Sequence, residues 1–300
     1  MNEFVLGKHR YNICDLESNV EYIDKLFSNE RPDSNFKKEK LDIQHSTFTN
    51  IGFREANIKN SNLSHNVFVS CYFKKSNIWN VNFTGCTFIN CKFDDVDIEH
   101  SDFIYANFEN CYIMYDIMYN NLPREFNLRE NLCRNFSMEC IKAGMDDDYK
   151  KYYFEERKAR EKNYYEIFRL NTKPYYKDNN MYQKIIAFFK YMQSKVSKVL
   201  WGYGENIWQL ICSMLFINMI YVIIYMFFGE SFSSQVDTDV NFKFNILNAI
   251  YFSISNFFTS SSGYYANNLS LRIIILSQYF VGVTFIGCFT AALYRNINRR

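Results

Sequence analysis

Proline is scarce in this 300-residue chain, which contains only three. Each proline lies where the composition of the sequence changes, which is typical of boundaries between segments. The three are Pro32, Pro123 and Pro174. The nine cysteines form no CxxC pair, and the four histidines have no metal-binding or catalytic spacing. We therefore expect reduced intracellular thiols, no bound metal or cofactor, and no catalytic residue.

Strong net charge is also missing, because the chain carries only +2. This balance argues against a general affinity for nucleic acid. The first ten residues are polar and lack an apolar segment, so we expect no secretory signal there. No nucleophile–base pair or phosphate loop is visible, and we do not expect an enzyme.

A five-residue repeat fills much of the N-terminal half. An apolar residue recurs at every fifth position from Ile43 to Ile113 without a gap. Period five matches neither a helix nor a strand, but it fits a chain that turns a corner every five residues. Four such sides make a square coil, and successive coils hydrogen-bond about 4.8 Å apart. Mostly small residues lie two positions before each large one, and they include Cys71, Cys86, Cys91 and Cys111. These cysteines are interpreted as buried apolar filler.

Residues 41–118 resemble the pentapeptide-repeat family on this pattern. The resemblance implies a right-handed quadrilateral β-helix, which we assign to residues 41–122. Some members of that family mimic DNA and inhibit topoisomerases, which needs a strongly acidic surface. The acidic excess here is small, and a solvated face explains the local cluster at 94–102 equally well.

The segment before the repeats is predicted to be a helical cap over residues 1–40. Ser18 and Glu21 have the spacing of a capping box, which predicts a helix over 18–27. Such a helix would close the open end of the stack of coils.

Two helical segments are expected after the repeats. Residues 123–173 are rich in Lys, Arg, Glu and Tyr and predict a helical hairpin that serves as a connector. Residues 181–204 place apolar side chains near one face and lysines away from it, which fits a helix in the cytoplasmic membrane interface. A soluble amphipathic helix has the same pattern, but the position directly before an apolar run favours the interface.

Two long apolar runs, 207–228 and 273–294, contain no charged residue. Each exceeds the ~20 residues that cross a ~30 Å hydrocarbon core. Lysines precede the first run and arginines follow the second, so the positive-inside rule predicts cytoplasmic N- and C-termini. The chain is thus expected to be a multi-pass protein of the cell membrane, with a pore domain over 205–300.

Between these runs, residues 247–258 are apolar but too short to span a membrane, as in a re-entrant helix. A hydroxyl-rich stretch follows, and it consists of Thr259, Ser260, Ser261, Ser262 and Gly263. Non-helical backbone at membrane depth is tolerated where it lines water or is buried in protein. We therefore interpret this arrangement as a pore loop, and a ring of identical chains would be needed to enclose a pathway.

Residues 207–295 resemble the two-helix potassium-channel superfamily at 249–253 and along the second span. The resemblance implies a fourfold channel, with Gly282 and Gly287 as gating hinges. The filter of that family reads Thr-Val-Gly-Tyr-Gly, and its carbonyls replace the hydration shell of potassium. The resemblance aligns 259–263 with it and implies that this stretch is the selectivity filter. Here Ser261 and Ser262 replace the first glycine and the tyrosine. The departure predicts a wider filter with weak selectivity among monovalent cations such as K+ and Na+, although hydroxyls alone do not exclude anions.

The leading hypothesis is a homotetrameric cation channel regulated by a cytoplasmic repeat domain. Its expected partners are membrane lipids and a cytoplasmic protein or ligand, and no nucleic acid. The alternative is a membrane-anchored scaffold whose repeats bind a cytoplasmic partner. A simple anchor would not need an apolar re-entrant segment followed by a polar loop.

Overall fold

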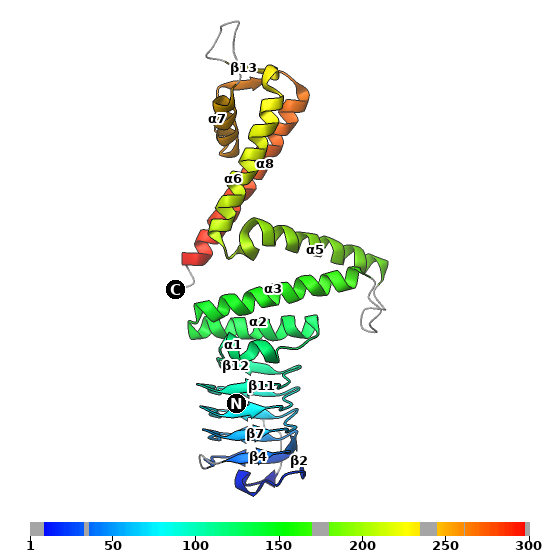
Figure 1. Cartoon of the computed structure of the whole chain (residues 1–300), viewed down its shortest axis with the longest axis vertical. Helices are drawn as coiled ribbons and strands as arrows, with labels where there is room; N and C mark the ends of the chain where they lie inside the picture. Colours follow the sequence, from blue (N-terminus) through cyan, green and yellow to red (C-terminus); the bar gives the residue numbers. More distant parts are fainter. Residues whose placement is uncertain (1–8, 33–35, 170–179, 235–244, 261, 298–300) are drawn as a thin grey trace. The chain divides into compact units, whose positions relative to one another are not determined.

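The chain divides into two compact units, Met1–Tyr191 and Met192–Arg300. The structure is a computed structural model, and Figure 1 labels its helices and strands. It describes residues 9–32, 36–169, 180–234, 245–260 and 262–297.

The first unit begins with a β-solenoid of about five turns, visible in Figure 1 as a stack of short strands. Residues twenty positions apart pair in parallel, as Phe48 does with Phe68 and Phe68 with Phe88. Twenty residues make four sides of five, which is the square coil that the repeat predicted. The strands are β1 (His9–Arg10), β2 (Glu21–Ile23), β3 (Lys25–Ser28), β4 (Lys37–Glu39), β5 (Asp42–Gln44), β6 (Thr47–Thr49), β7 (Asn57–Lys59), β8 (Val67–Val69), β9 (Asn77–Trp79), β10 (Thr87–Ile89), β11 (Asp97–Glu99) and β12 (Asn107–Glu109).

The predicted helix over 18–27 is wrong, and the described part of 1–40 contains only one short 3-10 helix, η1 (Ile13–Asp15). Strands β2 and β3 occupy this segment and belong to the solenoid. Tyr22 pairs with Ile43, twenty-one residues away, instead of the twenty that separate later coils. Because one extra residue shifts the register, the first coil drops out of the unbroken five-residue series.

A column of stacked phenylalanine rings forms part of the solenoid core. Their ring centroids lie 4.6–4.9 Å apart from one coil to the next. The column consists of Phe27, Phe48, Phe68, Phe88 and Phe108, all buried. Such offset aromatic pairs stabilise beyond their buried area. The large inward residues of the repeat therefore form the continuous core that their spacing predicted.

The four repeat cysteines are buried in the small inward positions. The thiol of Cys86 donates to the Leu63 carbonyl oxygen at 2.8 Å. Burial raises the pKa of Cys86 to about 12. A thiol of this kind is a small core side chain with little thiolate at neutral pH.

Every fifth residue from Lys40 to Asn110 has a positive φ. These residues make the corners between the sides of each coil. Asparagine recurs at them because its short polar side chain tolerates the left-handed region. Successive corner asparagines also hydrogen-bond, as Asn80 Nδ2 does to Asn60 Oδ1 at 2.8 Å.

A helical cap closes the C-terminal end of the solenoid, and its main elements are α1 (Tyr115–Met118), η2 (Tyr119–Asn121), α2 (Phe126–Ala143) and α3 (Asp146–Phe168). The ring of Phe136 of α2 packs in a tilted arrangement on Phe108, with centroids 4.5 Å apart, and stacks on Tyr152 of α3 at 5.0 Å. These contacts extend the aromatic column. The Asn135 amide accepts from the Phe108 N–H and donates to the Phe108 carbonyl, both at 2.8 Å. The cap thus satisfies backbone groups that the last coil would otherwise leave unpaired.

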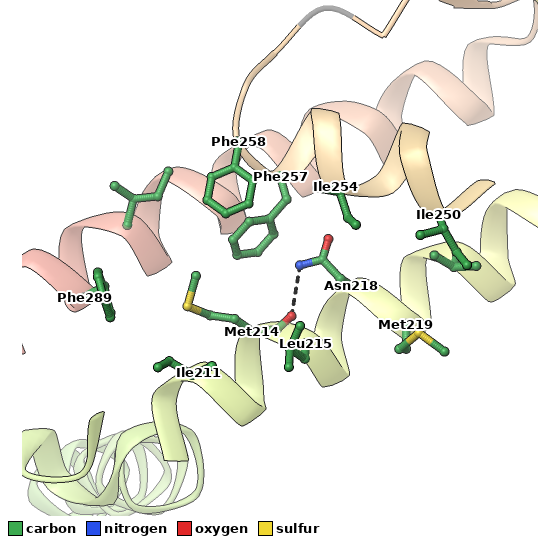
Figure 2. Close-up of a pocket in the computed structure, with 12 residues that line it drawn as sticks. Ile211, Met214, Leu215, Asn218, Met219, Ile250, Ile254, Phe257, Phe258 and Phe289 are labelled. Carbon is green, nitrogen blue, oxygen red and sulfur yellow. Dashed lines mark hydrogen bonds between the residues drawn. The ribbon is translucent and has the colours of Figure 1, made fainter. Parts of the chain in front are cut away.

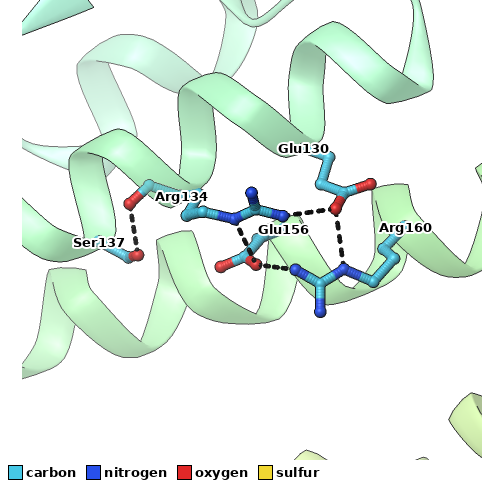
Figure 3. A network of polar contacts seen from close by, with 5 residues as sticks. All are labelled: Glu130, Arg134, Ser137, Glu156 and Arg160. Atoms are coloured by element: carbon cyan, nitrogen blue, oxygen red, sulfur yellow. Dashed lines mark hydrogen bonds and ion pairs between the residues drawn. The ribbon is translucent and has the colours of Figure 1, made fainter.

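The hairpin of α2 and α3 carries an ion-pair network on its facing sides (Figure 3). Arg134 and Arg160 each contact both Glu130 and Glu156. Both glutamates are largely buried, so the paired charges satisfy each other. Gly144 ends α2 in a left-handed conformation, with φ of 72°. These contacts fix the two helices against each other as one cap.

The described residues of the second unit are helical apart from one short ribbon. The boundary between the units falls within α5, whose exposed apolar residues include Ile185, Phe189 and Val196. The bend after α5 is η3, where Gly202, Tyr203 and Gly204 all have positive φ. The elements are α5 (Met181–Trp201), η3 (Gly202–Gly204), α6 (Ile207–Phe227), η4 (Gly229–Ser231), β13 (Phe232–Ser234), α7 (Ile246–Phe257), β14 (Tyr264–Ala266) and α8 (Leu269–Ile297).

Candidate functional site: a short helix held against two long apolar helices

Helices α6 and α8 are long and apolar enough to cross a membrane by length and composition. Only 17% of the most apolar stretch of each is buried within the chain. The core helix of a soluble protein would be mostly buried, so this exposure argues against that interpretation. Large outward side chains include Phe216 on α6 and Phe280 on α8, which are 67% and 77% exposed. Such a surface requires an apolar environment or a partner.

Helix α7 is a twelve-residue apolar helix that packs on both long helices. Asn245 caps its N-terminus by accepting from the Asn248 N–H. In the middle of α7, the ring of Phe252 contacts the ring of Tyr225 of α6 in an edge-on arrangement, with their centroids 4.9 Å apart. Near its end, Phe257 packs against Phe285 of α8 at 6.0 Å. The middle and the C-terminal end of α7 are therefore fixed by aromatic contacts.

A buried polar cluster lies where the three helices meet. Gln278 of α8 is fully buried, and its Nε2 donates to the Ser253 Oγ of α7 at 2.8 Å. Its Oε1 accepts from the Tyr225 hydroxyl of α6 at 2.6 Å. The Ser253 hydroxyl in turn lies 3.2 Å from the Asn218 Oδ1 of α6. Such interhelical hydrogen bonds stabilise helix packing where water is absent.

The chain turns sharply after α7. Thr259 has a φ of 55°, and its N–H donates to the Asn256 carbonyl. The Ser260 N–H donates to the Ser255 carbonyl at 2.7 Å. Both side chains are exposed in the single chain. The hydroxyl-rich stretch thus begins directly from the C-terminal turn of α7.

The far end of this stretch is held by a two-stranded antiparallel ribbon of β13 and β14. Ser262 and Gly263 are half-buried and lie just before β14, and Gly263 has a φ of 72°. Ser261 lies outside the described residues. Arg272 of α8 donates to the Ala266 carbonyl at 3.0 Å and fixes the ribbon to the start of α8.

The two glycines predicted as hinges have different surroundings. A Cβ on Gly282 would lie 2.1 Å from the Phe257 carbonyl oxygen of α7. Gly282 therefore permits a close approach of α8 to the end of α7. A Cβ on Gly287 would have no described heavy atom within 4 Å. Close packing of α8 against α7 is therefore sufficient to explain a glycine at position 282.

An apolar groove of about 750 Å³ opens between the three helices (Figure 2). Leu215 and Met219 of α6 line one side, and Ile254 and Phe258 of α7 line the other. The described lining contains a single polar residue, Asn218, whose Nδ2 donates to the Met214 carbonyl at 3.0 Å. The groove can therefore accommodate apolar groups.

The polar cluster was missed by sequence reasoning. Asn218 and Gln278 are polar residues inside long apolar runs, and that is the signal that could have indicated it. The partner Ser253 carries no such signal, because serines are common throughout 253–262. No group of His, Cys, Asp and Glu in the described residues could hold a metal ion.

Comparison with known proteins identifies the repeats. A family model of pentapeptide repeats matches residues 48–88 in eight copies. The chain therefore contains pentapeptide repeats in a β-solenoid. No curated protein matches the chain.

Among solved structures, two trypsin-treated forms of QnrB1, a plasmid-mediated fluoroquinolone resistance protein, are similar. The first is 17% identical, with a TM-score of 0.17, over 36% of this chain and 57% of that chain. The second is 16% identical, with a TM-score of 0.13, over 31% of this chain and 63% of that chain. The match thus spans less than two thirds of either QnrB1 chain, and no argument about function rests on it.

Proposed function

We propose that the chain is one subunit of a cation channel, in which α6 and α8 span the membrane and α7 is a re-entrant pore helix. The observation that carries this proposal is the placement of α7. It is a short apolar helix packed on two long ones, and a hydroxyl-rich turn follows it directly. A membrane anchor has no use for such an element, whereas a pore needs one.

The polarity of α7 favours cations. A helix carries a partial negative charge at its C-terminus, and the C-terminus of α7 leads into 259–263. Several chains in a ring would direct several such ends toward one axis. Residues 246–263 also contain no Lys or Arg. These features explain a preference for cations that hydroxyl groups alone would not provide.

We propose four chains per channel and weak selectivity between K+ and Na+. The selectivity follows from Ser261 and Ser262, which replace the glycine and the tyrosine of a potassium filter. The repeat domain and both termini would lie in the cytoplasm, where the solenoid can receive a regulatory partner. Lipids would contact the exposed apolar faces of α6 and α8.

Cysteine modification in planar bilayers tests the proposal. We expect purified wild-type protein to conduct and to be insensitive to a water-soluble methanethiosulfonate. The Ser262→Cys variant should conduct and then lose current when the reagent is added. Absence of current from intact oligomers would reject the channel. Equal insensitivity of the variant would reject 259–263 as its filter.

A membrane-anchored scaffold is the second candidate. The exposed residues Met138 and Ile141 of α2 favour it, because they form an apolar stripe on the outside of the solenoid cap. Under this alternative the second unit only anchors the chain. The scaffold would be supported if intact vesicle-bound protein carried no current but bound a cytoplasmic protein. The Ile141→Glu variant should then lose this binding.

A further inference from the structure

Three residues of α8 hold three residues of α7 in one register. The fully buried Gln278 lies against Ser253, and Gly282, one turn later, lies against Phe257, also one turn later. Both pairs advance by four residues, so the helices run in step over this turn. Between them, the Tyr279 hydroxyl of α8 donates to the Asn256 Oδ1 of α7 at 3.0 Å. We call these six residues the α7–α8 clamp.

Gln278 is the best-connected side chain of the clamp. Its Nε2 donates to the Ser253 carbonyl at 3.0 Å and to the Ser253 Oγ at 2.8 Å. Its Oε1 accepts from the Tyr225 hydroxyl, which belongs to α6. One amide therefore ties all three helices together. An amide buried without these partners would cost free energy, so the arrangement favours a single position of α7.

The clamp lies directly before the proposed filter. Asn256 and Phe257 are its last α7 members, and Thr259 follows two residues later. The N–H groups of Thr259 and Ser260 donate to carbonyls of Asn256 and Ser255. A shift of α7 would thus move the backbone atoms that begin the filter. A covalent path of only two residues leaves little room to absorb such a shift.

We propose that Gln278 is a positioning residue for ion selection: through Ser253 it holds α7 in the place that sets the backbone of Thr259 and Ser260, where the proposed filter begins. This inference rests on the proposed channel function. The amide does not touch the permeant ion. It acts by fixing the depth and rotation of α7, so its loss should change which ions pass and not merely how much protein folds.

The test compares Gln278→Met with Ser277→Ala in planar bilayers. Methionine keeps an unbranched side chain of similar length and removes every hydrogen bond of the amide. Ser277 is the matched control, because its hydroxyl lies 2.9 Å from the Tyr221 hydroxyl of α6 and has no hydrogen bond to a described residue of α7. Gln278→Met removes at least three interhelical hydrogen bonds, and one such bond averages ~0.6 kcal/mol, or a factor of about three. We therefore expect Gln278→Met to change the K+/Na+ permeability ratio at least about threefold. Ser277→Ala should keep the wild-type ratio.

Amide hydrogen exchange of the same variants gives a second readout that does not need a current. Loosening of α7 should speed exchange at the N–H groups of Thr259 and Ser260 in Gln278→Met, relative to wild type and to Ser277→Ala. A wild-type permeability ratio together with unchanged exchange in Gln278→Met would overturn the positioning role while leaving the channel intact. If the wild-type protein carries no current, the channel proposal fails, and the exchange result alone then decides whether Gln278 positions the backbone of Thr259 and Ser260.

Discussion

The contrast between Gly282 and Gly287 leads to a paired prediction on one helix. Alanine at position 282 places a Cβ 2.1 Å from the Phe257 carbonyl oxygen. Nonbonded carbon and oxygen atoms need about 3.3 Å, so α7 and α8 must separate by roughly 1 Å. Overpacking of this kind costs about 1–3 kcal/mol. Alanine at position 287 has no described heavy atom within 4 Å and instead gains about 0.8–1.0 kcal/mol of helix propensity.

We therefore expect Gly282→Ala to lower, and Gly287→Ala to raise, the free energy of unfolding of the full chain in detergent. Unfolding by increasing sodium dodecyl sulfate, followed by circular dichroism, measures both. Since the chemical change is identical and the sites are five residues apart, differences in helix propensity cancel. Equal effects of the two variants would refute the packing argument for Gly282. Loss of ion current in Gly287→Ala, with an unfolding free energy at least as high as that of the wild type, would support the hinge prediction for that residue.

Three further predictions concern the solenoid. Asn135→Ala leaves the N–H and carbonyl of Phe108 without their side-chain partner, so it should lower the unfolding free energy by about 1–3 kcal/mol in urea titrations. The control Asn131→Ala, at an exposed site of the same helix, should change the unfolding free energy by no more than about 0.5 kcal/mol. Equal effects of the two variants would show that Asn135 does not cap the solenoid. Burial raises the pKa of Cys86 to about 12. At pH 8 iodoacetamide should therefore alkylate the exposed Cys14 and reach Cys86 only after unfolding. Rapid labelling of Cys86 in the folded chain would contradict its burial. Because the folded-state pKa of Cys86 is raised, its contribution to stability is present below the ordinary thiol pKa and is lost as the pH rises through the folded-state pKa. The unfolding free energy should therefore decline above about pH 9. This alkaline decline should be smaller in Cys86→Ala.

The repeat was predictable because each of its positions has one simple physical role. Large residues such as Phe68 must point inward, small ones such as Cys71 must fill the space beside them, and both occur in every side of every coil. The first coil was not predictable by the same means. One additional residue before Ile43 shifts Tyr22 out of the five-residue series. The strands of the first two coils still pair in the structure, but the insertion interrupts the sequence period by which a coil is recognised.

The second unit shows a similar limit. The long apolar runs and the short apolar segment between them predicted helices that lie within a few residues of α6, α7 and α8. Which polar residues meet could not be predicted, because Gln278, Ser253 and Tyr225 are far apart in sequence and meet only through helix packing. The role of Gly282 was hidden for the same reason, since its constraint comes from a carbonyl on another helix.

The reversal potential of purified protein in a planar bilayer, under a tenfold gradient of potassium chloride, tests the central claim most directly. A cation pore predicts a reversal potential with the sign of the potassium equilibrium potential, and replacement of potassium by sodium on one side should shift it only slightly. A reversal potential of the chloride sign, or no current from intact membrane-inserted protein, would contradict the account.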